Sequence, residues 1–195
     1  TFEGIIEKIP YLTELGITYL HLMLLLKIPY PDNDGGYAIE DFRQVDPKIG
    51  TNEELEMLAD ELHARGISLC LDFVMNHTAD SHEWAMRAKA GEKEFQDCYY
   101  CYDTREIPDK FEENFHQILP KDAPGNFIYS EEMGKWVMSR FYPFQWDLNY
   151  HNPKVMQERI ETILFLANLG ADAIRLDAAM GIWKDEENYG SSLDH

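Results

Sequence analysis

The sequence predicts an α/β protein built on a parallel β-sheet with helical crossovers. Three stretches share one plan, in which a helical segment with apolar residues about 3.6 positions apart is followed by a glycine and a short apolar strand. These stretches are IIEKIPYLTELG-ITYLHLML, EELEMLADELHARG-ISLCLDFV and ERIETILFLANLG-ADAIRLDA. Repeated alternation of helix and strand is typical of a parallel sheet whose strands are joined by helices.

The ends of the predicted helices carry recognisable signals. Glycines stand where helix C-caps belong: Gly16, Gly66 and Gly170. The second helix begins with Thr51, and Glu54 follows three residues later, which is the pattern of a capping box. The third helix opens with Asn152 as N-cap and Pro153 in its first turn.

The spacing of the cap glycines locates an insertion. The first two are 50 residues apart and the last two are 104 apart, a difference of 54. The extra residues lie between about 78 and 150, in a stretch rich in aromatic, proline and charged residues without a sustained period. We therefore expect a small inserted subdomain at 78–150 between parts of the parallel α/β fold at 1–77 and 151–195, and long insertions of this kind are usually functional.

Composition limits the partners. The chain of 195 residues has 36 acidic and 17 basic residues and a net charge of −19. Such a charge repels phosphate backbones and anionic lipids, so neither nucleic acid nor a membrane surface is expected as a partner, whereas a neutral ligand is compatible. The longest apolar run, around Leu22 to Leu26, is too short to cross a bilayer.

The cysteines and the amino terminus favour a cytoplasmic protein. The amino terminus has no charged leader followed by an apolar stretch. The three cysteines, Cys70, Cys98 and Cys101, are an odd number and lack a second pair at zinc spacing. We expect free thiols in a reducing compartment.

Charged residues gather at the carboxyl ends of the predicted strands. Arg175 and Asp177 lie two positions apart in a run that is otherwise typical of a buried β-strand, so they point to the same face. Asp72 and His77 end the preceding strand. Taken alone, Arg175 and Asp177 could be a buried structural ion pair. Ligand sites of parallel α/β folds form at this edge of the sheet, and a guanidinium there would keep a neighbouring carboxylate ionised.

Four segments carry a family resemblance: DGGYAIEDFRQVDPKIGT, LDFVMNHTADSHEWA, FQWDLNYHNP and NLGADAIRLDAAMGIWK. They resemble the α-amylase family of glycoside hydrolases and transferases, and within it most closely the amylosucrases and their sucrose-acting relatives. The resemblance implies a partial (β/α)₈ TIM barrel, of which about three parallel strands are present. It also implies a small domain inserted after the second of these strands.

The resemblance assigns catalytic roles to two residues. Asp177 matches the family's nucleophile, so it would attack the anomeric carbon of a glucosyl unit and form a covalent intermediate with retention. Arg175 would orient Asp177 and keep it ionised.

It also assigns a substrate-binding set: Asp34, Tyr37, Asp72, His77 and Phe141. His77 would hydrogen-bond the sugar at the cleaved position and Asp72 would support that region. Tyr37 would form an aromatic platform under the same ring. Asp34 resembles the pocket-floor aspartate of sucrose-acting members, and Phe141 would add an apolar wall. No cofactor is expected. Asn76 is a calcium ligand in many α-amylases, but the amylosucrase-like group does not characteristically need calcium, so no metal is expected either.

The resemblance leaves part of the chemistry unsupplied. Retaining enzymes need a second carboxyl group about 5 to 5.5 Å from the nucleophile, and the family takes it from a glutamate after the fifth strand. We therefore expect a fragment that is inactive alone and that associates through its open sheet edges. The leading expectation is glucosyl transfer from sucrose, with an α-glucan or water as acceptor. The alternatives are an α-glucosidase or α-amylase-type hydrolase, a sucrose phosphorylase or isomerase, and a non-catalytic carbohydrate-binding barrel.

Overall fold

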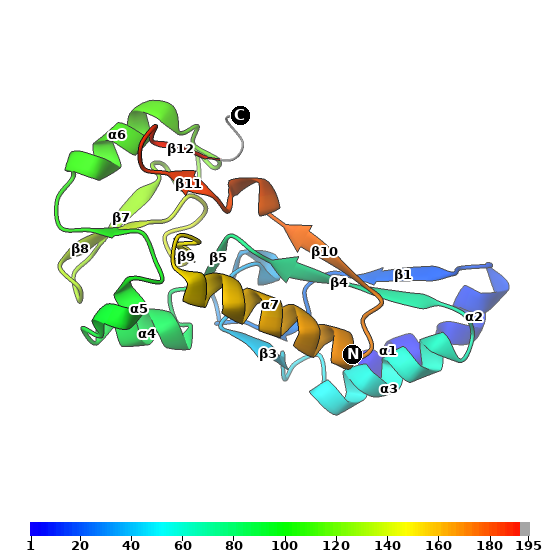
Figure 1. Ribbon diagram of the computed structural model, residues 1–195. Coiled ribbons are helices and arrows are strands. Elements are labelled where there is room, and N and C mark those ends of the chain that lie inside the picture. Colours follow the sequence, from blue (N-terminus) through cyan, green and yellow to red (C-terminus); the bar gives the residue numbers. More distant parts are fainter. Residues whose placement is uncertain (192–195) are drawn as a thin grey trace.

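A three-stranded parallel sheet forms the centre of the computed structural model, which describes residues 1–191 (Figure 1). Its strands are β1 (Tyr19–Leu22), β4 (Ser68–Val74) and β10 (Ala173–Asp177), in the order β1-β4-β10. Both neighbouring pairs are parallel. The predicted sheet of about three parallel strands is therefore confirmed, and the carboxyl ends of these strands lie at one edge of the sheet.

Two of the three predicted helices form as expected. The second is α3 (Asn52–His63), and its capping box is complete: Glu54 N donates to Thr51 Oγ1 at 3.2 Å and Thr51 N donates to Glu54 Oε2 at 2.9 Å. The third is α7 (Pro153–Asn168), where Asn152 Oδ1 accepts a hydrogen bond of 3.0 Å from the second residue after it. Both helices thus begin with satisfied backbone donors.

The first predicted helix is wrong as a continuous element, because it is divided into α1 (Phe2–Ile6) and α2 (Ile9–Glu14). Pro10 has no backbone N–H and its ring clashes with the preceding turn of a helix, so it is tolerated only in a first turn. It occupies the first turn of α2. The chain therefore interrupts the helix just before the proline.

The predicted cap glycines all adopt left-handed φ angles: Gly16 75°, Gly66 70° and Gly170 101°. Gly170 is constrained twice. A Cβ at this position would lie 2.4 Å from the Cβ of Ala59 on α3, so the end of α7 approaches α3 more closely than any side chain would permit. Any side chain at this position would therefore push the end of α7 away from α3.

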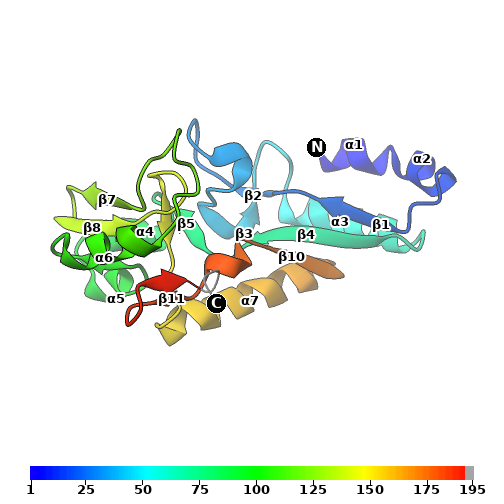
Figure 2. The same cartoon turned by 90° about the horizontal axis from the view of Figure 1, so that it is seen from above.

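Residues 78–150 form elements of their own at one end of the molecule (Figure 2). A short antiparallel pair, β5 with β9, stands at the base of this segment, and an antiparallel sheet follows in the order β6-β8-β7. The strands and helices are β5 (His77–Ala79), α4 (Glu83–Lys89), α5 (Lys93–Gln96), β6 (Cys101–Tyr102), α6 (Glu106–Asn114), β7 (Phe127–Ser130), β8 (Lys135–Met138) and β9 (Gln145–Asp147). Part of its apolar interior is continuous with the main core through Trp84, Phe95 and Trp146. The division of the chain into three parts remains a proposal, and residues 192–195 of its last part lie outside the described residues.

Short elements in the loops complete the fold. They are β2 (Leu26–Lys27), η1 (Asp34–Gly36), β3 (Asp41–Val45), η2 (Ala179–Gly181), β11 (Lys184–Asp185) and β12 (Gly190–Ser191). The loop containing η1 follows β1, and the loop containing η2 and β11 follows β10. These loops bring further side chains to the carboxyl edge of the sheet.

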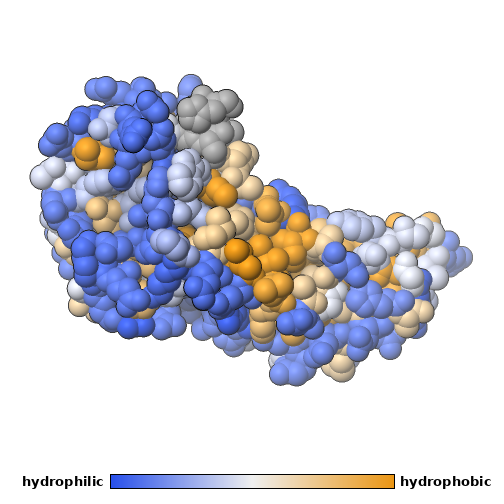
Figure 3. Space-filling view, in the orientation of Figure 1, coloured by the Kyte–Doolittle hydropathy of each residue, from blue (hydrophilic) through white to orange (hydrophobic). Residues whose placement is uncertain are grey.

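One side of the sheet is apolar and uncovered. Strand β10 is at the edge of the sheet, and a hydrophobic surface extends over it and α7 (Figure 3). Large apolar side chains exposed there are Met156, Ile160, Leu164, Leu176 and Met180. An unpaired strand edge beside an apolar helix face is a typical site of association.

The three cysteines are free thiols, as expected. Burial raises the pKa of Cys98 to about 11 and that of Cys101 to about 12, so neither forms a reactive thiolate near neutral pH. In residues 1–191 no helix combines the length and the apolar character that crossing a membrane requires.

His82 predicts a loss of stability in acid. It caps α4 by accepting a hydrogen bond of 3.1 Å from Trp84 N, and burial lowers its pKa to about 3, with Arg159 adding to the effect. Below the ordinary pKa of 6.5, His82 binds a proton in the unfolded chain but not in the folded chain. The free energy of unfolding therefore falls as the pH drops toward 3. Because asparagine also caps helices, His82→Asn is expected to reduce the loss between pH 7 and pH 4.5 by about 2 kcal/mol.

Urea unfolding at the two pH values measures this difference. The exposed His116→Asn is the matched control and is expected to leave the loss unchanged. An unaltered pH dependence in His82→Asn would contradict the assignment.

Candidate active site

Five of the seven predicted site residues line one cavity at the carboxyl edge of the sheet. This cavity has a volume of about 310 Å³, near the lower limit of about 300 Å³ for small-molecule pockets. Its predicted lining residues are Asp34, Tyr37, His77, Phe141 and Asp177. They come from loops and strand ends far apart in the sequence.

The other two predicted residues, Arg175 and Asp72, lie directly behind Asp177 and Tyr37. Parallel register places Arg175 opposite Asp72. The guanidinium bridges two carboxylates, with Nη1 2.8 Å from Asp72 Oδ2 and Nη2 3.1 Å from Asp177 Oδ1. His21 Nε2 lies 2.6 Å from Asp72 Oδ1, and Tyr37 OH donates to Asp72 Oδ2 at 3.4 Å. The side chains of Arg175, His21 and Tyr37 thus all contact the Asp72 carboxylate, and Asp72 in turn positions Arg175.

One expectation about Arg175 is wrong. The strand was expected to be buried, but the Arg175 side chain is 47% exposed. Among the described residues, β10 has a strand neighbour on one side only, which leaves its other side open. The ion pair itself forms as predicted, with Asp177 more enclosed than its partner.

Two opposing effects act on Asp177. Burial raises the pKa of its carboxyl group above the ordinary value, and the nearby charge of Asp72 adds to the rise, while Arg175 lowers it. Burial likewise raises the pKa of Asp34, where the Gln145 amide opposes the effect. Arg175 therefore counteracts the desolvation that would otherwise favour the neutral acid.

His77 is buried and neutral at the back of the cavity. Burial lowers its pKa to about 4. Its Nε2 lies 3.1 Å from the carbonyl oxygen of Tyr37 and 3.0 Å from Gln145 Nε2. Its ring also packs on Phe141, with ring centroids 4.9 Å apart. The imidazole is therefore fixed in orientation by groups from two separate segments, the loop containing Tyr37 and the stretch that carries Phe141 and Gln145.

Asn76 is engaged by a cation of the protein itself. Its Oδ1 accepts a hydrogen bond of 2.6 Å from the ammonium group of Lys184, which also lies 2.8 Å from Asp147 Oδ2. In residues 1–191 no group of three or more His, Cys, Asp or Glu side chains is arranged to hold a metal ion. These residues therefore do not fit a calcium site.

Several residues of the site were not predicted. Ile118 and Leu119, from the loop after α6, add an apolar wall to the cavity. Gln145 Nε2 donates to Asp34 Oδ2 at 3.1 Å. Gln145 stands inside the FQWDLNY segment, which offered a signal, whereas Ile118 and Leu119 lie in a stretch without periodicity and gave none.

The sheet, its helical crossovers and the cavity at the strand ends define this chain as part of a parallel α/β barrel with its site at the carboxyl edge. The chain belongs to the α-amylase family: the family described as "Alpha amylase, catalytic domain" matches residues 1–193. The predicted family is thereby confirmed.

Similar proteins with assigned functions include enzymes acting on several α-glucosides. The chain is 33% identical over 193 residues to a trehalose synthase of Pimelobacter sp. (strain R48), covering 98% of this chain and 33% of that protein. It is 35% identical over 184 residues to an oligo-1,6-glucosidase of Heyndrickxia coagulans, covering 93% of this chain and 32% of that protein. The chain thus spans about a third of the length of these relatives.

Similar solved structures support the same family. A trehalose-6-phosphate hydrolase of Bacillus licheniformis superposes with a TM-score of 0.85 at 29% identity, covering 97% of this chain and 33% of that one. An isomaltulose synthase variant from Erwinia rhapontici NX5, solved with its natural substrate sucrose, gives a TM-score of 0.83 at 28% identity, covering 94% and 32%. These similarities support the family and do not single out amylosucrase.

Proposed function

We propose that this chain is the nucleophile-bearing part of a retaining enzyme that transfers or hydrolyses glucosyl units of sucrose or another α-glucoside. The observation that carries the proposal is the position of Asp177, which lines the cavity while Arg175 holds it at 3.1 Å. A carboxylate that faces a cavity and is kept anionic by a guanidinium suits nucleophilic attack on a sugar carbon.

The proposed reaction has two steps. An Asp177 oxygen bonds to the anomeric carbon as the bond to the leaving-group oxygen breaks, and a general acid protonates that oxygen. Water or a second sugar then attacks the same carbon, giving up its proton to the same group, and Asp177 is released. We assign that acid and base to a glutamate of the complete barrel, so the chain alone is expected to turn over no sugar.

A chimera tests this proposal. The chain would replace the corresponding third of the Heyndrickxia coagulans oligo-1,6-glucosidase, to which it is 35% identical. We expect the chimera to cleave an α-glucoside with retention, and the chain alone to cleave none. A chimera that folds, judged by circular dichroism and a cooperative melt, yet neither hydrolyses nor transfers glucosyl units would refute the proposal.

The products separate the finer alternatives. Among similar proteins are trehalose and isomaltulose synthases, whose names denote disaccharide products. Incubation with sucrose distinguishes an amylosucrase-like enzyme, which lengthens a glucan, from an isomerase, which yields a new disaccharide. Free glucose and fructose would indicate a hydrolase, and phosphate-dependent cleavage would indicate a phosphorylase. A barrel that only binds sugar would give no product.

We also keep the proposal of a cytoplasmic location, supported by the free thiols.

Ile118 and Leu119 are proposed to contact the group attached to the glucosyl unit, because they close the cavity with an apolar wall. Ile118→Ser in the active chimera is expected to lower kcat/KM about tenfold for an aryl α-glucoside and much less for sucrose, since lost apolar contact costs about 1 to 3 kcal/mol. The surface variant Ile160→Ser is the control. Equal losses for both substrates would contradict this role.

We also propose that the chain, taken by itself, associates through β10 and the apolar face of α7. The exposed Leu164 and Leu176 lie on this surface, while the net charge of −19 opposes association. Added salt screens that repulsion. The sedimentation coefficient is therefore expected to rise between about 50 mM and about 500 mM salt. Leu164→Glu should reduce the rise, and a monomer at every salt concentration would contradict the proposal.

A further inference from the structure

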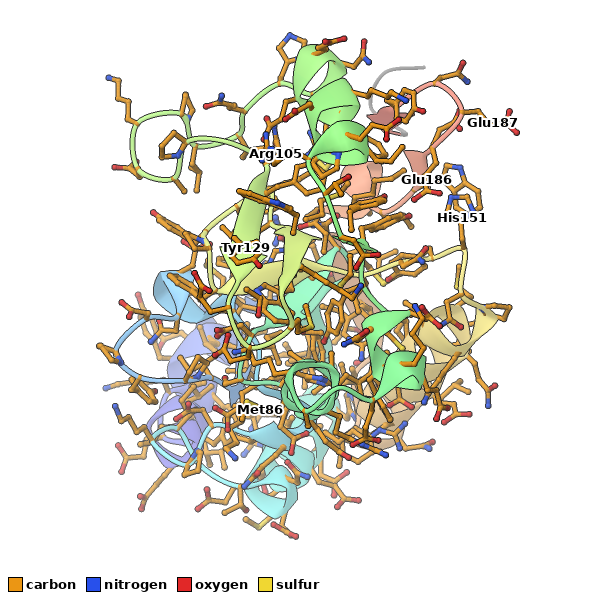
Figure 4. All side chains as sticks on the ribbon, turned by 90° about the vertical axis from the view of Figure 1, so that its left-hand side faces the viewer. Met86, Arg105, Tyr129, His151, Glu186 and Glu187 are labelled. Atoms are coloured by element: carbon orange, nitrogen blue, oxygen red, sulfur yellow. The ribbon has the colours of Figure 1, made fainter. Side chains whose placement is uncertain are left out.

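Lys184 is completely buried, although it follows the nucleophile strand by only a short loop. Strand β10 leads through η2 to β11, where the Lys184 side chain has 0% exposure. The Lys184 carbonyl oxygen lies 2.7 Å from His151 Nε2. His151 lies on the same side of the molecule as Glu186, which follows β11 (Figure 4). The backbone at β11 is thus anchored, and it directs the ammonium group inward.

The ammonium group fixes the orientation of a neighbouring amide. An ammonium can only donate hydrogen bonds, so the Asn76 atom that lies 2.6 Å from Lys184 Nζ must be the carbonyl oxygen Oδ1. The amide nitrogen of Asn76 therefore points the other way. There it lies 3.3 Å from Nδ1 of His77.

This orientation constrains the proton of the imidazole. An amide nitrogen has hydrogens to donate and no free lone pair, so Nδ1 of His77 must accept and carry no proton. The proton then resides on Nε2, where it can be donated to the Tyr37 carbonyl oxygen at 3.1 Å.

One contact opposes this assignment and two support it. Tyr142 N donates to Gln145 Oε1 at 2.9 Å, which fixes the Gln145 amide and leaves its nitrogen 3.0 Å from His77 Nε2. A proton on Nδ1 would satisfy that contact. It would also set a donor against the Asn76 nitrogen and a lone pair against the Tyr37 oxygen. The Nε2–H form is favoured by two contacts to one.

We propose that Lys184 is a positioning residue that acts through Asn76 to keep the His77 proton on Nε2. This inference rests on the proposed function for its consequence: Nε2 lies beside Tyr37 and Gln145, next to the cavity, and a sugar oxygen that replaced the Tyr37 carbonyl as acceptor would meet a donor there rather than a lone pair. Lys184 itself does not line the cavity. Acting through Asn76, it determines whether Nε2 of His77 presents a hydrogen-bond donor or an acceptor beside the cavity.

The tautomer can be read without any sugar, in the chain as it is. Nitrogen-15 NMR of the histidine rings distinguishes a protonated ring nitrogen from an unprotonated one. We expect His77 to show a protonated Nε2 at pH 7. In Lys184→Met the Asn76 amide is free to turn, and the ratio of Nε2–H to Nδ1–H is expected to fall about fivefold, as loss of one hydrogen bond predicts.

The matched control is Lys93→Met, which removes an exposed lysine paired with Asp97 on the surface. It should leave the ratio unchanged. A protonated Nδ1 in the unsubstituted chain, or the same ratio in Lys184→Met as in the control, would overturn the inference. Loss of glycosyl activity in the chimera does not affect this measurement, so a failure of the proposed function remains distinguishable.

A second variant covers the case in which Lys184→Met does not fold. Asn76→Asp keeps a partner for Lys184 but replaces the amide donor with an acceptor. His77 should then place a proton on Nδ1 to bond the new carboxylate. An unprotonated Nδ1 in Asn76→Asp would show that the neighbouring side chain does not control the tautomer, and the inference would fail.

Discussion

Replacement of Asp177 by asparagine in the active chimera is expected to lower kcat by about 10⁴-fold or more, the usual consequence of removing a nucleophile. The amide is nearly the same size and can still accept a hydrogen bond from Arg175, so the cavity keeps its shape. It has no negative charge and cannot form the bond to the anomeric carbon. Initial rates with sucrose and with an aryl α-glucoside measure the loss.

Chemical rescue distinguishes loss of the nucleophile from loss of structure. In Asp177→Gly, azide would occupy the space of the missing carboxylate and attack an α-glucosyl fluoride, which releases fluoride without needing a general acid. The product would be a glucosyl azide of inverted configuration. Asp80→Asn, a carboxylate outside the cavity, is the control. Asp177→Asn with activity within tenfold of the unsubstituted chimera would contradict the assignment of the nucleophile.

Local signals in the sequence were sufficient for much of the fold. Thr51 and Glu54 predicted where α3 begins, because a capping box is formed by residues three positions apart in the chain. The cap glycines predicted where helices end, for the same local reason. The apolar period alone predicts a continuous first helix, whereas Pro10 divides it, because a proline is tolerated only in a first turn.

The site was predictable only where its residues lie in strands or family segments. Arg175 and Asp177 share a face because strand side chains alternate, and this follows from their spacing. Their partner Asp72 depends on the register of two strands 103 positions apart, which spacing alone does not give. The exposure of Arg175 depends on β10 being an edge strand, a property of the sheet rather than of the segment.

The position of Lys184 is the feature of the site that is hardest to predict from the sequence. In the sequence it is one lysine in the acidic stretch WKDEEN, and such residues usually lie on the surface. In the fold it is fully buried against Asp147 and Asn76. Burial lowers its pKa below the ordinary value and Asp147 opposes that effect, so the ion pair compensates part of the desolvation. No local pattern predicts this position, because it results from the return of the loop after β10.

The pair of Lys184 and Asp147 therefore predicts a large effect on stability. Both side chains have 0% exposure and their charged atoms lie 2.8 Å apart. Removal of one charge leaves the other buried without compensation, which typically costs about 3 to 5 kcal/mol. We expect Lys184→Met and Asp147→Asn each to lower the free energy of unfolding by about that amount, as measured by urea denaturation of the chain.

A double-mutant cycle separates the ion pair from simple packing. In Lys184→Met with Asp147→Asn neither charge remains, so the double variant should be less destabilised than the sum of the single variants by about 2 kcal/mol or more. Lys93→Met, on the exposed surface, should change stability little. Additive losses in the cycle would mean that the two charges do not compensate each other. The loop after β10 would then be held by packing rather than by its buried lysine.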